Sequence, residues 1–278
     1  MHLRASLFAA LFFVAAPTYG HPQAPATERP LPDVAELLRS VENNQSALDR
    51  AREQYTFRQQ QHLTFYNKHG HAEHTDEAVS HVFFVHGHPI ETLISKNGKP
   101  LSAGDLKKEQ DRATKEALKY QDQPYGSVDK NDLTVSQLLA VTRFDHPRRI
   151  FEEGRPVIVV NFVGNPHAKS HGRPEDAIKK VRGTMWIDEN AREVRRMQAT
   201  FDQPMRVGFG LLASVDPGSH FEFEQGLIRN EAWLPTRVDG RIDGHAALFL
   251  GFHVALEIRY DQYQKFSASA TQQTEPPQ

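Results

Sequence analysis

The last long segment of the sequence alternates apolar and polar residues over an unusual length. Between residues 246 and 263 every even position from Leu248 to Tyr260 is apolar, and polar side chains accumulate at odd positions from His253 to Asp261. Because successive side chains of a strand point to opposite faces, this pattern predicts one long strand with one apolar face. At ~3.3 Å per residue it spans roughly 50 Å, which is typical of a large curved sheet. The apolar face must then be covered by helices, by a lipid-like ligand or by both.

Helical periodicity is confined to a few stretches. Asp33 and Glu36 have the spacing of a capping box at the start of a helix whose apolar residues recur at helical spacing. A charged helix with a thin apolar stripe is predicted over 102–120, and a third helix over 133–141. Pro174 is suited to open a further short helix. The chain therefore contains about three substantial helices.

Strands joined by short turns account for most of the remaining sequence. Connections of hairpin length imply antiparallel pairing, so we expect an α+β fold with a large curved antiparallel sheet of about 10–11 strands. We place a turn at Asp239 and Gly240. No linker interrupts the series, which favours a single domain over residues 33–266. The strands are predicted over residues 55–66, 78–85, 90–95, 149–152, 156–163, 181–188, 192–201, 205–213, 220–227 and 232–242 and in the final segment.

The N-terminal residues have the organisation of a secretory signal peptide. A short charged start precedes an uncharged apolar run from Leu7 to Ala16, and small residues follow up to Gly20. We expect residues 1–20 to be removed, 21–32 to form a flexible leader rich in Pro and Ala, and 267–278 to form a disordered tail. The run is too short for a permanent membrane helix, and no other segment is long enough to be one. These features predict a soluble mature protein in the periplasm or outside the cell.

The composition excludes several classes of function. The chain has no cysteine, which excludes disulfides, thiol catalysis and cysteine-based zinc sites. A net charge of −2 with interspersed signs gives no basic surface for nucleic acid. We expect no cofactor.

One hairpin carries a resemblance to a known family. The sequence Arg182-Gly183-Thr184-Met185-Trp186-Ile187-Asp188, followed by Glu189-Asn190 and then Arg192-Glu193-Val194, resembles a recurring hairpin of the LolA/LolB lipoprotein carriers. The order of elements is also similar over most of the chain. The resemblance implies a half-barrel whose concave apolar face is lidded by about three helices and holds acyl chains of a lipid or lipidated partner. The same fold also serves regulators that dock on envelope proteins, so both functions remain open.

The apolar face of the last strand provides the candidate ligand site. Its side chains could line an apolar groove for an acyl chain, or they could be ordinary core residues beneath the helices. The candidate groove residues are Leu248, Leu250, Phe252, Val254, Leu256, Phe221, Phe223 and Trp186.

An enzyme is the least favoured class. His69, His71 and His74 could converge on a metal, although their spacing matches no defined site and favours a polar loop. The segment 82–89 ends in His86-Gly87, as in the oxyanion turn of some hydrolases, but the chain lacks the Gly-x-Ser-x-Gly nucleophile motif. A strand and turn is the better interpretation. A metal-dependent enzyme using the histidine-rich region is the remaining alternative.

Two further features have functional and structural interpretations. Asp188 could be a functional carboxylate, but at a strand end it is expected to accept hydrogen bonds from local amides. The pairs Arg148-Arg149 and Arg195-Arg196 could attract phosphates or an acidic partner, and we expect them to be solvated.

Overall fold

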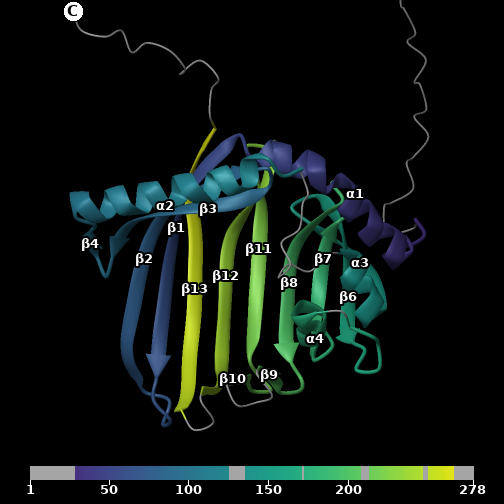
Figure 1. Ribbon diagram of the computed structural model, residues 1–278. Coiled ribbons are helices and arrows are strands. Elements are labelled where there is room, and N and C mark those ends of the chain that lie inside the picture. The colour runs from purple at the N-terminus through teal and green to yellow at the C-terminus, as the bar shows by residue number, and fades with distance from the viewer. Residues whose placement is uncertain (1–28, 125–134, 171, 208–212, 247–249, 266–278) are drawn as a thin grey trace, which may run out of the picture. The chain divides into compact units, whose positions relative to one another are not determined.

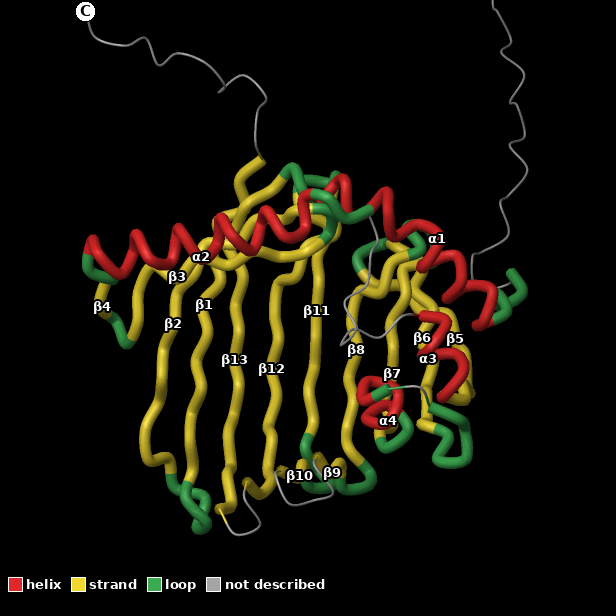
Figure 2. Tube along the Cα trace, in the orientation of Figure 1, coloured by secondary structure: helices red, strands yellow, loops and turns green. Residues whose placement is uncertain are grey.

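The described part of the chain forms one open, mostly antiparallel sheet with few helices (Figures 1 and 2). It comprises residues 29–124, 135–170, 172–207, 213–246 and 250–265 of a computed structural model. The strands are β1 (Tyr55–Tyr66), β2 (Ala72–Val85), β3 (His88–Lys96), β4 (Lys99–Pro100), β5 (Thr142–Glu152), β6 (Arg155–Gly164), β7 (Val181–Asp188), β8 (Glu193–Phe201), β9 (Met205–Val207), β10 (Ala213–Val215), β11 (His220–Ile228), β12 (Ala232–Ala246) and β13 (Leu250–Lys265). Across the sheet they run β4-β3-β2-β1-β13-β12-β11-β8-β7-β6-β5, and β10 joins β9 to β12.

Four helices lie in the described residues: α1 (Val34–Arg52), α2 (Ala103–Gln121), α3 (Val135–Val141) and α4 (Arg173–Ile178). The predicted cap of α1 is present, because the amide of Glu36 donates to Oδ1 of Asp33 at 2.9 Å. Pro174 lies in the first turn of α4, as expected. The predicted start of α3 at residues 133 and 134 lies outside the described residues. Among the described helices, none is long and apolar enough to cross a membrane.

Strand alternation divides the sheet into two faces. We call the face against α1 the inner face and the other the outer face. Leu37, Leu38 and Val41 of α1 pack on even positions of β6, such as Ile158 and Phe162, and on odd positions of β7 and β8. Residues of α3 and α4 join the same core, so these three helices cover the β5–β8 end of the inner face.

Helix α2 packs on the outer face, contrary to the prediction that all helices lid the concave side. Ala113 and Tyr120 of α2 pack against Ile90, with Phe83 and Val85 beside them. The intervening residues Val82 and Phe84 instead join the core formed with Ala51 of α1. Because neighbouring residues of β2 point to opposite faces, α1 and α2 lie on opposite sides of the sheet.

The final strand differs from the prediction at its start. Strand β13 begins at Leu250 and ends at Lys265, and it pairs antiparallel with both β1 and β12. Ala246 belongs to β12 and pairs with Leu250, so segment 246–263 includes the end of one strand and most of the next. Residues 247–249 lie outside the described residues. The alternation of apolar and polar residues continues from β12 into β13, so the sequence pattern gave no sign that the chain reverses direction between them.

The predicted turn at Asp239-Gly240 is wrong. Gly240 lies within β12, where it pairs with Phe221 on one side and Leu256 on the other. A Cβ at this position would lie 2.9 Å from the carbonyl oxygen of His220, so the glycine allows close approach of the backbone. The described residues contain 13 strands, more than the 10–11 expected, partly because β4, β9 and β10 are very short.

The hairpin of β7 and β8 is held by Asp188. This carboxylate is fully buried, and its Oδ1 accepts hydrogen bonds from the amides of Asn190 at 3.0 Å and Ala191 at 2.7 Å. The expected local role is therefore present. The sequence did not reveal Arg155, whose guanidinium donates to both carboxylate oxygens, at 2.5 and 3.0 Å. Burial acts to raise the pKa of Asp188, but the hydrogen bonds from Arg155 and the two amides outweigh it and hold the pKa below its ordinary value.

We predict that Asp188→Asn destabilises the protein by about 3 kcal/mol, because it removes one partner of a buried ion pair and leaves Arg155 without its carboxylate. Urea unfolding of the full chain measures this change. Asp202→Asn is the matched control, since Asp202 meets Arg182 at 3.1 Å in a pair that is largely exposed. The control should lose less than about 1 kcal/mol. Equal losses in the two variants would contradict the assignment.

The lowered pKa of Asp188 also predicts the direction of a pH effect. The folded state holds the ionised carboxylate more strongly than the unfolded state does. The stabilisation is therefore complete above the ordinary carboxyl pKa and is lost as pH falls through the lower folded-state value. Unfolding free energies from pH 7 down to pH 3 should decline less steeply in Asp188→Asn than in the wild type. Parallel declines would show that other carboxylates control acid stability.

Candidate ligand-binding surface

The inner face carries a continuous apolar surface across β11, β12, β13 and β1. Phe221 pairs with Gly240, and Gly240 pairs with Leu256, which pairs with Leu63. Directly paired residues share a face, so these side chains lie in one row with the core around α1. The neighbouring rows contribute Phe223, Val238 and Ile258 on one side, and Ile242, Val254 and Phe65 on the other. We call these residues, together with Phe252, the inner apolar surface.

This surface is only partly covered. Its members are half-buried, and Ile242 keeps 41% of its surface exposed. Figures 1 and 2 show α1 and α2 near one end of the strands, whereas the described helices leave the long middle parts of β13, β12 and β11 uncovered. Among the described residues, these apolar side chains therefore lack the covering layer that would complete a core. Such a surface is suited to an apolar ligand.

Two glycines lower the floor of the surface along β12. Gly240 lies between Phe221 and Leu256, as described above. Gly244 pairs with Phe252, and a Cβ at Gly244 would lie 2.7 Å from the tip of the Phe252 ring. The Phe252 ring therefore rests over the glycine backbone. Apolar side chains flank both glycines: Phe221 of β11 and Leu256 of β13 lie beside Gly240, and Val215 of β10 and Phe252 of β13 lie beside Gly244.

A pocket of about 260 Å³ opens at the α1 end of the inner apolar surface. Its walls include the aromatic side chains of Phe57, Phe84, Phe223 and Tyr260, and Arg52 from the last turn of α1. The ring centroids of Phe57 and Tyr260 lie 5.6 Å apart in an edge-to-face contact, and that of Phe84 lies 5.8 Å from Phe57. Phe223 belongs to both the pocket and the inner apolar surface, so the two are continuous.

Polar groups line one side of the pocket. The amide of Gln59 donates to Oε2 of Glu91 at 3.1 Å. Arg52 donates to Glu193 at 3.0 Å and to the carbonyl oxygen of Trp233 at 3.1 Å. An apolar cavity with a few oriented polar groups is the usual form of a small-molecule site.

The tyrosine that lines the pocket, Tyr260, has a raised pKa because the pocket buries it. Burial, together with the negative charge of Glu91, raises the pKa of Tyr260 to about 12. Tyr263, which packs against Phe57, also has a raised pKa, because of burial and the charges of Asp261 and Tyr260. The hydroxyl of Tyr263 donates to the carbonyl oxygens of Pro235 and Tyr260. Both phenols stay neutral at ordinary pH, so Tyr260 contributes an uncharged wall to the pocket.

The eight candidate groove residues are not all brought together. Phe221, Phe223, Phe252, Val254 and Leu256 share the inner apolar surface. Leu248 lies outside the described residues, and of Leu250 only the backbone, at the start of β13, is described.

Trp186 lies on the outer face, because it follows the inner-facing Met185 and pairs with Val159 and Arg196. The guanidinium of Arg196 stacks over its ring at 5.0 Å. Trp186 is thus separated from the other described candidates by the thickness of the sheet.

The outer face of the central strands is densely charged. Glu222, Asp239, Glu257 and His62 form one row across β11, β12, β13 and β1. Arginines of neighbouring rows compensate these carboxylates: Arg259 meets Asp239 at 3.1 Å and Glu257 at 3.0 Å. The contrast between the two faces follows directly from the alternation in the sequence.

The histidines do not form a metal site in the described residues. No group of three or more His, Asp or Glu side chains there has the geometry to hold a metal ion. His74 instead stacks on Phe65 with ring centroids 4.3 Å apart. The segment 82–89 is a strand and turn, with positive φ at His86 and Gly87.

The arginine pairs are less solvated than expected. The side chain of Arg149 is only 4% exposed and donates to both carboxylate oxygens of Glu189, at 2.7 and 2.8 Å. Arg195 is 12% exposed. The prediction that these arginines lie in water is therefore wrong for Arg149 and Arg195, which cross-strand partners and turns enclose, whereas Arg148 is exposed as expected.

The sequence reasoning missed the pocket itself. Phe57, Leu63 and Phe65 alternate along β1 with the same period as the final strand, and this signal was sufficient to place them on one face. Arg52, Phe84 and Glu91 come from other elements and could not be assigned before the pairing of β1, β2 and β3 was known.

Comparison with known proteins does not add to these observations. No protein-family model matches the sequence, and no curated protein matches it either. We therefore infer the function from the geometry of the chain.

We predict that Tyr260 ionises near pH 12 and that alkaline unfolding depends on it. The unfolded phenol ionises at about pH 10, so the stabilisation by burying neutral Tyr260 is lost as pH rises from 10 to about 12. Ultraviolet titration of Tyr260→Phe should lack one transition near pH 12. The unfolding free energy of this variant should also fall less than that of the wild type between pH 10 and about 12. Loss of a transition centred near pH 10 instead would contradict the burial of this phenol.

Proposed function

We propose that this protein binds an acyl chain of a lipid, or of a lipidated partner, on the inner apolar surface. The acyl chain would lie along β13 and β12 and reach the pocket beside Arg52. The proposal assigns a binding function and no catalytic residue. It includes a half-barrel architecture of the LolA/LolB type and a periplasmic or secreted location after removal of the signal peptide.

The observation that carries the proposal is the continuity between the pocket and the partly exposed inner apolar surface. A core residue under a helix has no reason to remain exposed, whereas Ile242 keeps 41% of its surface exposed beside Val254 and Phe221. Burial of each methylene of an acyl chain on such a surface contributes about 0.8 kcal/mol. The opposite face of the same central strands is charged, so at these strands the inner face is the one that can supply this energy.

Polar groups favour a ligand with a polar end. The apolar part of the surface ends at a pocket that contains Arg52, Gln59 and Glu91. All three side chains already have partners within the chain, so they orient a neutral or hydrogen-bonding head group rather than neutralise a free charge. The apolar run along β13 from Tyr260 to Phe252 then accommodates the hydrocarbon.

Substitution of Leu256 tests this function. Leu256→Gln places an amide in the centre of the inner apolar surface and should weaken binding of a fluorescent fatty acid by about tenfold, because it removes apolar contact at the middle of the chain. Fluorescence titration with cis-parinaric acid measures the affinity, and thermal unfolding verifies that the variant is folded.

Glu257→Gln is the matched control, since Glu257 is the next residue of β13 and points to the outer face. It should leave the affinity unchanged. Absence of fatty-acid binding by the wild type, or equal loss in both variants, would refute the acyl-binding function. That result would favour the alternative of an envelope docking protein without lipid transport, for which the charged outer face is the available surface.

A further inference from the structure

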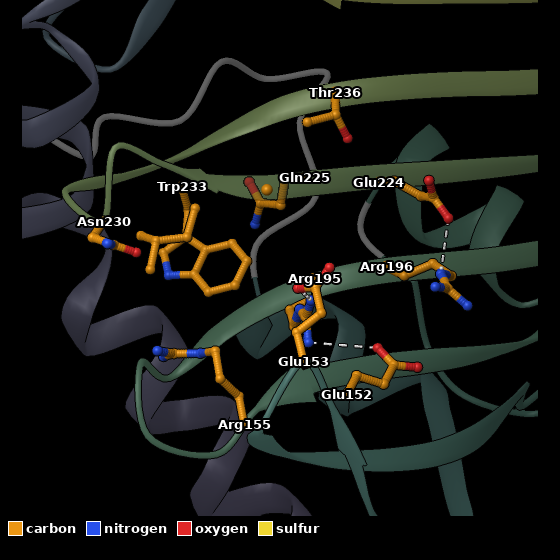
Figure 3. A pocket seen from close by; sticks show the side chains of 12 residues that line it. Glu152, Glu153, Arg155, Arg195, Arg196, Glu224, Gln225, Asn230, Trp233 and Thr236 are labelled. Atoms are coloured by element: carbon orange, nitrogen blue, oxygen red, sulfur yellow. Dashed lines mark hydrogen bonds and ion pairs between the residues drawn. The ribbon is translucent and has the colours of Figure 1, made fainter.

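A second hollow, of about 600 Å³, lies near the turn between β5 and β6. Figure 3 shows this turn facing β8 and the hairpin of β11 and β12, with Arg195 and Arg196 between them and the Trp233 ring to one side. We call it the arginine cleft. Gln225 lines both this cleft and the inner pocket, whereas the other residues that line the cleft do not line the pocket.

A bulge in β8 places two neighbouring arginines in the cleft. Trp186 pairs with Arg196 while Ile187 pairs with Val194, so Arg195 is an extra residue opposite the β7 strand. In a bulge two successive side chains are directed to similar sides instead of alternating. The guanidinium of Arg195 lies 5.5 Å from the Trp233 ring centroid, and that of Arg155 lies 5.7 Å from it. Trp233 therefore fixes both cations.

Arg195 retains an unsatisfied donor. Its Nη1 is buried and has no hydrogen-bond acceptor in the described residues, the oxygen Oε2 of Glu152 being 3.5 Å away. The neighbouring Arg196 is one-third exposed, and its Nε lies 2.9 Å from Oε1 of Glu224, its ion-pair partner. Buried donors are nearly always satisfied, because a buried donor without an acceptor has lost its hydrogen bond to water and gained none in return. An acceptor supplied by a ligand would remove this cost.

The carboxylate that now meets Arg195 is easily displaced. Oε2 of Glu153 accepts from Nη2 of Arg195 at 2.9 Å, but the Glu153 side chain is 81% exposed. It lies on a tight turn in which Glu153 and Gly154 have φ values of 52° and 74°. Only the Glu153 partner of this ion pair is exposed, so its carboxylate is already largely hydrated and can leave Arg195 when a ligand takes its place.

We propose that the arginine cleft binds a phosphoryl group through Arg195 and Arg196, with Glu153 as a built-in competitor for the same guanidinium. A phosphoryl group offers three strong acceptor oxygens, so one group could accept from both adjacent arginines, whereas separate carboxylates now meet them, Glu153 at Arg195 and Glu224 at Arg196. The group could belong to a soluble phosphate or to a phospholipid head group. This site is independent of acyl binding on the inner face.

Isothermal titration of the full chain with inorganic phosphate and with phenyl phosphate tests the site, and flotation with phosphatidylglycerol vesicles tests the lipid source. Glu153→Gln removes the competing charge and should tighten binding severalfold. Arg195→Gln should weaken it by about tenfold or more, as expected for the loss of hydrogen bonds from a charged group. Arg182→Gln is the control, since Arg182 is 66% exposed and pairs with Asp202 outside the cleft.

The outcomes separate the possibilities. Binding of the soluble phosphates with this order of affinities supports the proposal and identifies a free phosphate ligand. Binding to phosphatidylglycerol vesicles alone, with the same order, supports it and identifies a head group. If Arg195→Gln does not fold, the exposed Glu153→Gln still decides the question. Absence of binding by Glu153→Gln to every phosphate probe, or weaker binding than by the wild type, would overturn the proposal.

Discussion

The antiparallel register of β1, β13, β12 and β11 is the constraint on which the rest of the structure depends. Paired residues across these strands share a face, so the apolar residues of each strand lie beside the apolar residues of its neighbours. A slip of one residue in β13 would exchange Leu256 with Glu257 and would place charge on the inner apolar surface. The division of these central strands into an apolar inner face and a charged outer face is therefore a single, cooperative property of their register.

The helices occupy only the parts of the sheet that their own apolar residues can cover. Leu37, Leu38 and Val41 bind α1 to the β5–β8 end, and Ala113 and Tyr120 bind α2 to the edge strands on the opposite side. The central strands have no described helix over their middle. The two proposed sites follow from this distribution: the acyl ligand would complete the uncovered inner face, and the phosphoryl group would satisfy a donor that a bulge has turned into the arginine cleft.

Much of the fold could be predicted from local sequence patterns, and the errors of that prediction have identifiable causes. Asp33 and Pro174 marked helix starts correctly, since capping and a fixed φ are local effects. Gly240 was misjudged as a turn residue because the sequence does not distinguish a glycine needed for a turn from one needed for close approach in a sheet. Trp186 was grouped with Phe221 as a groove residue, although the register places them on opposite faces.

The sequence by itself determined that the final strands have one apolar face, since the period of two is a property of each strand alone. It also determined the local caps and the hairpin around Asp188, whose amide partners are two and three residues away. Only the tertiary structure decided which apolar residues meet in the pocket, and that Arg155 neutralises Asp188 and that Arg195 lies against Trp233. These contacts join residues 33 and 38 positions apart, and their geometry depends on strand order and on the bulge in β8, which local sequence patterns do not encode.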